Sequence, residues 1–155
     1  MQNTADLFIQ LRPGWIDRVS RNLAKGTGVR ESFLIQLNQF YDSLQQSVES
    51  GDPAWMETIL ADWAAARTAT ELADAEISLY PLISNILNLT NEYIRDSLSP
   101  ADGMTLTAEI LPVFAHMYEN VAEKEIKMRI SHVFQELESA RTSLEKLDKA
   151  SSSVK

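Results

Sequence analysis

Residues 126–147 read IKMRISHVFQELESARTSLEKL, and the spacing of their apolar side chains decides how the C-terminal part of the chain folds. The apolar positions alternate steps of four and three residues without a miss: Ile126, Ile130, Val133, Leu137, Ala140, Leu144 and Leu147. A seam of this width is typical of a coiled coil with one partner helix, and it is narrower than the apolar face of a helix in a globular core. We therefore predict a parallel homodimer through this seam, with Glu136 of one chain facing Arg141 of the other.

A second apolar stripe precedes this seam at the same spacing. Its members are Leu106, Ile110, Phe114, Met117 and Val121. Ile126 follows Val121 by five residues, and one extra residue rotates a stripe by roughly 100° around a helix. We interpret this shift as a change of packing partner, from the chain's own domain to another chain. Residues 123–125 (Glu-Lys-Glu) are then expected to lead the helix into solvent.

This interpretation divides the chain into two parts. Residues 1–122 are expected to form a helical sensor or input domain, and residues 123–155 a coiled-coil signalling helix that leads to an output domain. The alternative is a helix that ends near Asn120 and restarts at Ile126. A continuous helix is favoured because no glycine or proline lies between Val113 and Lys155.

Composition excludes several classes of protein. A length of 155 residues supports one domain, and a net charge of −8 argues against nucleic acid as a partner. The chain has no cysteine, which excludes disulfides and thiolate zinc sites and fits a cytoplasmic location. It has no apolar run of the length that crosses a membrane, and its N-terminus lacks the pattern of a signal peptide.

The remaining sequence predicts an all-α helical bundle, because glycine and proline are few and no stretch alternates as a strand does. Helices are expected over 3–11, from Pro13 to Gly26, over 29–50, from Asp52-Pro53 to Ala66, over 79–98, and from Thr105 or Thr107 to Ala150. Residues 99–103 (Ser-Pro-Ala-Asp-Gly) are expected to be a loop. Pro112 is expected to bend the last helix or to mark its first turn.

The chain has two histidines and no recognisable catalytic motif. We therefore expect no enzymatic activity and no cofactor. His116 is the weak candidate for a haem ligand, since helical sensor domains hold haem through a histidine; the alternative is a histidine at a contact between helices. His132 falls outside the seam and is expected to face solvent.

Trp55, Trp63 and Arg67 are the most conspicuous cluster in the N-terminal part. A tryptophan face with an arginine four residues beyond it is a candidate pocket for an anionic or aromatic ligand. The alternative is two core tryptophans and an arginine that binds a carbonyl or an acid. Both alternatives stay open at this stage.

The block from Trp55 to Leu98, with Trp63-Ala64-Ala65-Ala66-Arg67 followed by Ile77-Ser78-Leu79, resembles the N-terminal input domain of RsbT co-antagonist proteins. The resemblance covers about two thirds of the chain. It implies a dimeric bacterial domain, of which some relatives are globin-like folds without haem.

The C-terminal residues 144–152 (LEKLDKASS) resemble the helix that precedes the phospho-acceptor histidine of bacterial sensor histidine kinases. In that family a lysine is common where Ser151 stands, and a phenylalanine where Val154 stands. Neither histidine of this chain carries the family's following Glu-Leu-Arg pattern. The resemblance implies that an output domain, a histidine kinase in the leading interpretation, follows in the same chain.

Together these observations predict a cytoplasmic, dimeric sensory domain of a two-component signal-transduction protein. An unidentified small molecule or protein would supply its signal. The alternatives are a stressosome-type scaffold that docks another protein, and a haem-binding, globin-like sensor.

Overall fold

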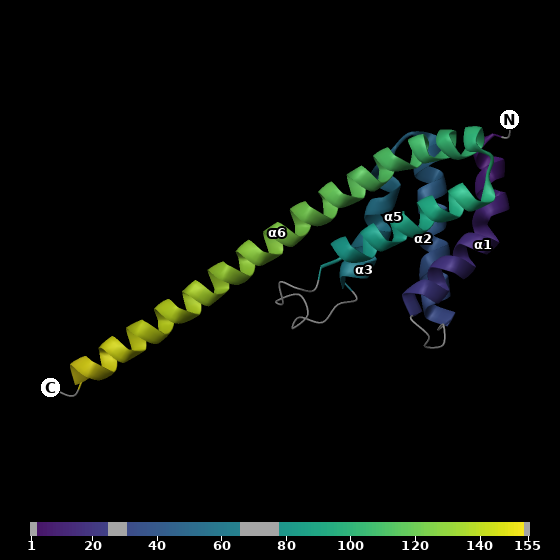
Figure 1. Cartoon of the computed structure of the whole chain (residues 1–155). Coiled ribbons are helices and arrows are strands. Elements are labelled where there is room, and N and C mark those ends of the chain that lie inside the picture. The colour runs from purple at the N-terminus through teal and green to yellow at the C-terminus, as the bar shows by residue number, and fades with distance from the viewer. Residues whose placement is uncertain (1–2, 25–30, 66–77, 154–155) are drawn as a thin grey trace.

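The structure is a computed structural model of the chain, and it describes residues 3–24, 31–65 and 78–153. In these residues it is all-α, as the sequence predicts, with a bundle of helices and one long C-terminal helix (Figure 1). The helices are α1 (Thr4–Ala24), α2 (Glu31–Ser50), the short 3-10 helix η1 (Pro53–Trp55), α3 (Met56–Ala65), α5 (Tyr80–Ser97) and α6 (Pro100–Ser153). Whether the bundle is globin-like stays a prediction.

The N-terminal segment forms one helix, so the predicted break at Pro13 is wrong. Proline removes one backbone hydrogen bond, but residues on both sides of it, including Phe8 and Trp15, are buried in the same core. Asn3 supplies the N-terminal cap, since its Oδ1 accepts a hydrogen bond from the Asp6 backbone N at 2.8 Å. A Cβ at Gly14 would lie 1.8 Å from the Tyr93 hydroxyl of α5, so a larger residue there would require the Tyr93 side chain to move.

The junction between α2 and α3 follows the sequence prediction. Gly51 has a φ of 71°, a left-handed conformation that ends α2 and that glycine adopts without strain. Asp52 then accepts a hydrogen bond from the Ala54 backbone N at 3.0 Å, and Pro53 occupies the first turn of η1.

Residues 100–103 are the first turn of α6 and not a loop, which corrects the sequence prediction. Ser99 starts this helix: its Oγ accepts from the Asp102 N and its carbonyl from the Gly103 N. Pro112 lies inside the helix, which continues to Ser153 without the interruption considered near Asn120. At 1.5 Å per residue the 54 residues of α6 span about 80 Å. Figure 1 shows its first turns inclined to the remainder.

A single hydrophobic core joins α1, α2, α3, α5 and the N-terminal part of α6. Phe40 of α2 lies at its centre, where its ring stacks on Trp15 of α1 and Trp63 of α3 and contacts Phe114 of α6. Within the core the Trp15 indole N–H donates to the Thr90 hydroxyl at 2.9 Å, so this buried donor is satisfied. The stripe from Leu106 to Val121 is buried, as the sequence predicts.

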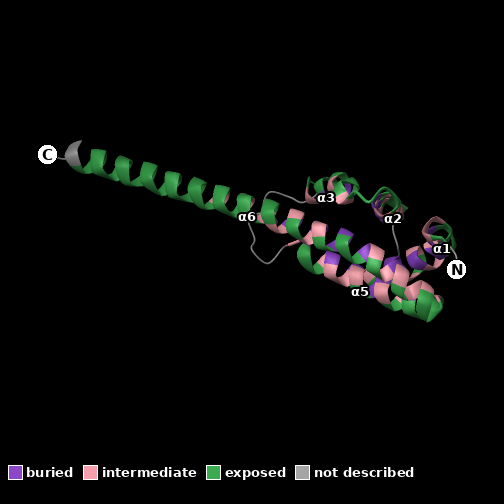
Figure 2. Cartoon of the chain, turned by 90° about the horizontal axis from the view of Figure 1, so that it is seen from above, coloured by how far each residue is buried: buried purple, intermediate pink, exposed green. Residues whose placement is uncertain are grey.

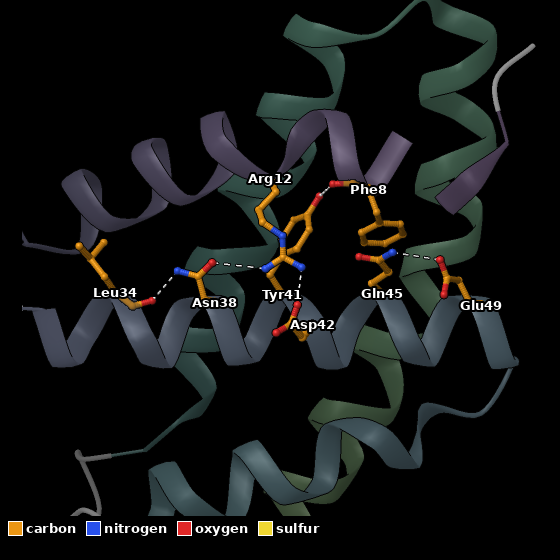
Figure 3. A network of polar contacts seen from close by, with 8 residues as sticks. All are labelled: Phe8, Arg12, Leu34, Asn38, Tyr41, Asp42, Gln45 and Glu49. Atoms are coloured by element: carbon orange, nitrogen blue, oxygen red, sulfur yellow. Dashed lines mark hydrogen bonds and ion pairs between the residues drawn. The ribbon is translucent and has the colours of Figure 1, made fainter. Parts of the chain in front are cut away.

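A polar network fastens α1 to α2 at the edge of this core (Figure 3). Arg12 forms an ion pair with Asp42, donates to Asn38 Oδ1 at 3.3 Å and lies over the ring of Tyr41. The buried Tyr41 hydroxyl donates to the Phe8 carbonyl of α1. Burial raises the pKa of Tyr41 well above its usual value, because the charged phenolate would lose its hydration there.

Candidate functional site

The predicted coiled-coil seam is an uncovered apolar stripe. From Ile126 to Leu147 its large side chains are between 50% and 67% exposed, and no described segment packs against them. Figure 2 shows this part of α6 extending from the bundle as an isolated, exposed helix. An apolar stripe of this length on a single helix is uncommon in a monomer and marks an interaction surface.

The rod (residues 126–153 of α6) begins just beyond the last core residue. Val121 is 3% exposed and is the last buried side chain among the described residues of α6. The boundary between residues 122 and 123 that the sequence predicts for two domains stays a prediction, although burial ends at this point.

Glu125 links the start of the rod to α5, which the sequence analysis missed. Its carboxylate accepts hydrogen bonds from the Ser78 hydroxyl at 2.5 Å and from the Leu79 backbone N at 2.8 Å. Ser78 Oγ in turn accepts from the Tyr80 N at 3.0 Å. Glu125 therefore caps the N-terminal end of α5, where free N–H groups and the helix dipole favour a negative charge. Glu123 and Lys124 are exposed as expected, whereas Glu125 is half-buried, so the expectation that all three face solvent is wrong for Glu125.

A cavity of about 270 Å³ lies beside this link, between α3, the start of α5 and α6. Its apolar lining comes from Leu60, Leu79, Val121 and Met128, and its polar lining includes Asn120. The Asn120 side-chain oxygen is buried and has no hydrogen-bond partner in the part of the chain that the structure describes. Residues of the domain core, of the Glu125 cap and of the rod thus line the same cavity.

The two tryptophans of the predicted ligand pocket lie in different environments. Trp63 is buried and its ring stacks on Phe40 at 5.3 Å between centroids, which makes it a core residue. Trp55 is half exposed in η1. Neither tryptophan lines the cavity beside Glu125, and Arg67 lies outside the described residues.

The two histidines contact carboxylates. His116 is 30% exposed, and its Nε2 lies 3.1 Å from an oxygen of Glu57 on α3. It therefore stands at a contact between helices, the alternative to the haem ligand in the sequence analysis, and its Nε2 already has a partner. His132 lies on the rod 3.1 Å from Glu136 of the next turn. Across the described ranges 3–24, 31–65 and 78–153, no group of three His, Asp or Glu side chains is arranged to hold a metal.

The link between Ser78 and Glu125 joins residues 47 positions apart, so no local pattern could have revealed it. The one available signal was Ser78 itself, a serine directly before the helix predicted over 79–98. In the described part of the chain no helix has the length and apolar character needed to span a membrane.

Comparison with known proteins found no matching family model, no similar curated protein and no similar solved structure.

Proposed function

We propose that this chain is a dimeric sensory input domain that passes a signal through its C-terminal helix to an output domain, in the manner of the sensor portion of a histidine kinase. The observation that carries the proposal is the uncovered heptad stripe on a rod that projects from a folded domain. A coiled coil is the structure in which such a stripe becomes buried, and a second copy of this chain presents an identical stripe.

Charges beside the stripe fit a parallel arrangement. Within one chain Glu136 contacts His132 and Arg141 contacts Glu145 at 3.4 Å. All four side chains are more than 40% exposed, so each is available to a partner in a dimer. Surface pairs of this kind contribute under about 1 kcal/mol, so they select the orientation while the apolar stripe supplies the affinity.

The signal is proposed to act at the junction formed by Ser78, Leu79 and Glu125. These contacts hold the first turn of the rod against α5. A ligand or protein that repacks the adjoining cavity would shift the rod against α5, and the coiled coil would transmit that shift as a rotation or a change of register.

The first experiment tests the dimer. Leu137→Asp places a charge in the seam and should convert the protein to a monomer in light scattering, while tryptophan fluorescence still reports a folded bundle, since Trp15 and Trp63 are buried in its core. Ser139→Asp is the matched control, because it adds the same charge on an exposed residue outside the seam. A Leu137→Asp protein that remains dimeric would remove the observation on which the proposal rests.

A second experiment tests sensing. A small molecule that binds the folded state at 100 times its dissociation constant adds about 2.7 kcal/mol of stability. A thermal-shift screen of metabolites should therefore find a stabilising compound. If the dimer forms but only another protein stabilises it, the scaffold alternative replaces the sensory one.

A further inference from the structure

The most exposed residues in the first turns of α6 are all apolar. Between Ala101 and Ala115 every exposed residue of α6 is apolar: Ala101, Met104, Ala108, Leu111, Pro112 and Ala115. Met104 is the most exposed large apolar residue of the described chain, at 76%. Surface helices normally present charged or polar residues on their outer side, and charged residues make up 23% of this chain. An outer face without any of them indicates a covering partner.

The same residues continue the stripe of the rod toward the N-terminus. Met104, Ala108, Leu111 and Ala115 follow one another at steps of four, three and four. Ala122 and Ile126 lie seven and eleven residues beyond Ala115, and both spacings return close to the same face of a helix. Between them Tyr118 is turned toward α5, where its hydroxyl donates to Ser84 at 2.9 Å, and the exposed side carries the charges of Glu119, Glu123 and Lys124. The stripe that begins at Met104 therefore runs on into the rod.

This outer stripe lies opposite the buried stripe of α6. Ala108 stands two residues from Leu106 and Ile110, and Ala115 two residues from Val113 and Met117, all four of which are buried. Two residues correspond to roughly 200° around a helix. Within the bundle α6 thus has two apolar faces, one turned to its own core and one to solvent. Val121 is the last residue of the inner stripe, and Ile126 belongs to the outer stripe. The shift of register between them therefore separates two stripes on different faces and is not a shift within one stripe.

A groove of about 640 Å³ borders the outer stripe where α5 turns into α6. Met104, Ala108 and Leu111 line it from α6, and Ile94 and Leu98 line it from α5. A helix laid along the outer stripe would cover this groove as well. The alanines at 108 and 115 leave room for the backbone of such a helix to approach closely.

We propose that the dimer interface extends from the rod into the bundle along this outer face of α6, so that the second copy of the chain also covers the groove between α5 and α6. The inference rests on the proposed function, because the occupant is the partner that the rod stripe requires. It adds that the two sensory domains contact each other directly. The outer stripe is continuous with the stripe of the rod, so the partner is expected to be parallel. Only in a parallel dimer does each residue of the outer stripe lie beside the same residue of the other chain.

Single cysteines test this directly, because the chain has none of its own. Four variants are compared under mild oxidation: Ala115→Cys on the outer face, Leu144→Cys in the rod, and Glu138→Cys and Asp62→Cys as exposed controls. A disulfide requires Cβ atoms about 3.5–4.5 Å apart, which paired seam positions approach. We expect covalent dimers from Ala115→Cys and Leu144→Cys and none from the two controls.

The outcomes separate the two proposals. Cross-linking at position 144 without cross-linking at 115 would overturn the extended interface and leave the rod dimer in place. Cross-linking at neither position would overturn both. Cross-linking at 115 alone would support the contact between domains and contradict the coiled coil.

A second measurement is needed because a disulfide can also form during brief collisions between chains that form no stable dimer. Ala115→Arg should raise the dimer dissociation constant at least about tenfold in sedimentation equilibrium, because its charge would be buried without a partner. Asp62→Arg, on the exposed side of α3, should leave the constant unchanged. An unchanged constant for Ala115→Arg would contradict the proposal, and would leave the groove to a different occupant.

Discussion

At the scale of single residues, two side chains form hydrogen bonds that join helices distant in sequence. The Tyr41 hydroxyl joins α2 to the Phe8 carbonyl of α1, and Glu125 joins α6 to the first turn of α5. The first contact lies in the middle of the α1–α2 packing, and the second lies where α6 leaves the bundle. These residues are therefore sensitive probes of how the bundle is held together.

The first prediction concerns Tyr41. Burial raises the pKa of Tyr41, so the folded state favours the neutral phenol over the phenolate. This preference stabilises the folded state fully below the ordinary tyrosine pKa of about 10, where the unfolded chain is neutral as well. It is lost as the pH rises above that value. Tyr41→Phe should cost about 1 kcal/mol at pH 7 through the lost hydrogen bond and should lessen the fall in stability between pH 9 and about 11.

Urea denaturation at several pH values measures both effects. Tyr80→Phe is the control, since Tyr80 is 44% exposed. If Tyr41→Phe loses stability at alkaline pH as steeply as the unmodified protein, the buried phenol is not the group that titrates.

A second residue-scale prediction concerns Glu125. Glu125→Gln removes the negative charge but keeps the shape, so the cap on α5 should weaken by about 1 kcal/mol. The amide protons of the first turn of α5 should then exchange faster with solvent in hydrogen-exchange measurements. Glu123→Gln is the matched control two residues away, because Glu123 forms a solvent-exposed ion pair with Lys127. Equal effects in the two variants would show that Glu125 does not act as a cap.

At the scale of elements, α6 combines two helices of different character in one. As far as Val121 its inner face belongs to the core, and beyond Ile126 its apolar residues face away from its own domain. Both stripes were readable from the sequence, because side chains three and four residues apart share a face of a helix. The outer stripe of the bundle was not recognised, since alanines at 108 and 115 carry little hydrophobic signal until their neighbours are known to be buried.

The errors of the sequence analysis have similar causes. The break expected at Pro13 and the loop expected at Pro100 and Gly103 rested on local preferences, which packing around Phe8 and Trp15 and the Ser99 cap override. The Glu125 cap could not be predicted, because nothing in residues 123–125 names a partner 46 positions away. Trp63 was recognisable from the sequence as a residue on an apolar helix face. The sequence pattern does not distinguish a tryptophan in the core from one that lines a ligand pocket.

A third prediction contrasts the two halves of α6. Phe114→Ala removes a fully buried ring from the core and should cost about 3–5 kcal/mol, with the loss independent of protein concentration. Leu144→Ala should act through dimerisation, so its loss in melting temperature should shrink as concentration rises. Calorimetry across a hundredfold range of concentration distinguishes them. A Leu144→Ala loss that ignores concentration would place that side chain in a contact within one chain.

At the scale of the whole molecule, the position of the bundle at one end of α6 distinguishes a parallel from an antiparallel dimer. A parallel dimer has both bundles together, and its length is close to the roughly 80 Å of one α6. An antiparallel dimer centred on the rod stripe would place the bundles at opposite ends, with more than about 110 Å between their outer ends.

The fourth prediction follows from this difference. Small-angle X-ray scattering should give a maximum dimension of roughly 80–100 Å for the dimer, with a single dense end. A longer particle with mass at both ends would contradict the parallel arrangement, and with it the direct contact between the two sensory domains.

The uninterrupted course of α6 also has a mechanical consequence. From Glu125 to Ser153 the helix is a lever about 42 Å long whose fulcrum is the cap on α5. A tilt of about 10° at the fulcrum would sweep the free end through roughly 7 Å, although the atoms at Ser78 and Leu79 would move by only a fraction of that distance. In the proposed dimer the two levers would be clamped along their length and could not swing apart, so the tilt could reach the far end only as a joint movement or a rotation of the paired helices. A small displacement at the Glu125 carboxylate would then arrive at the far end enlarged by the length of the lever.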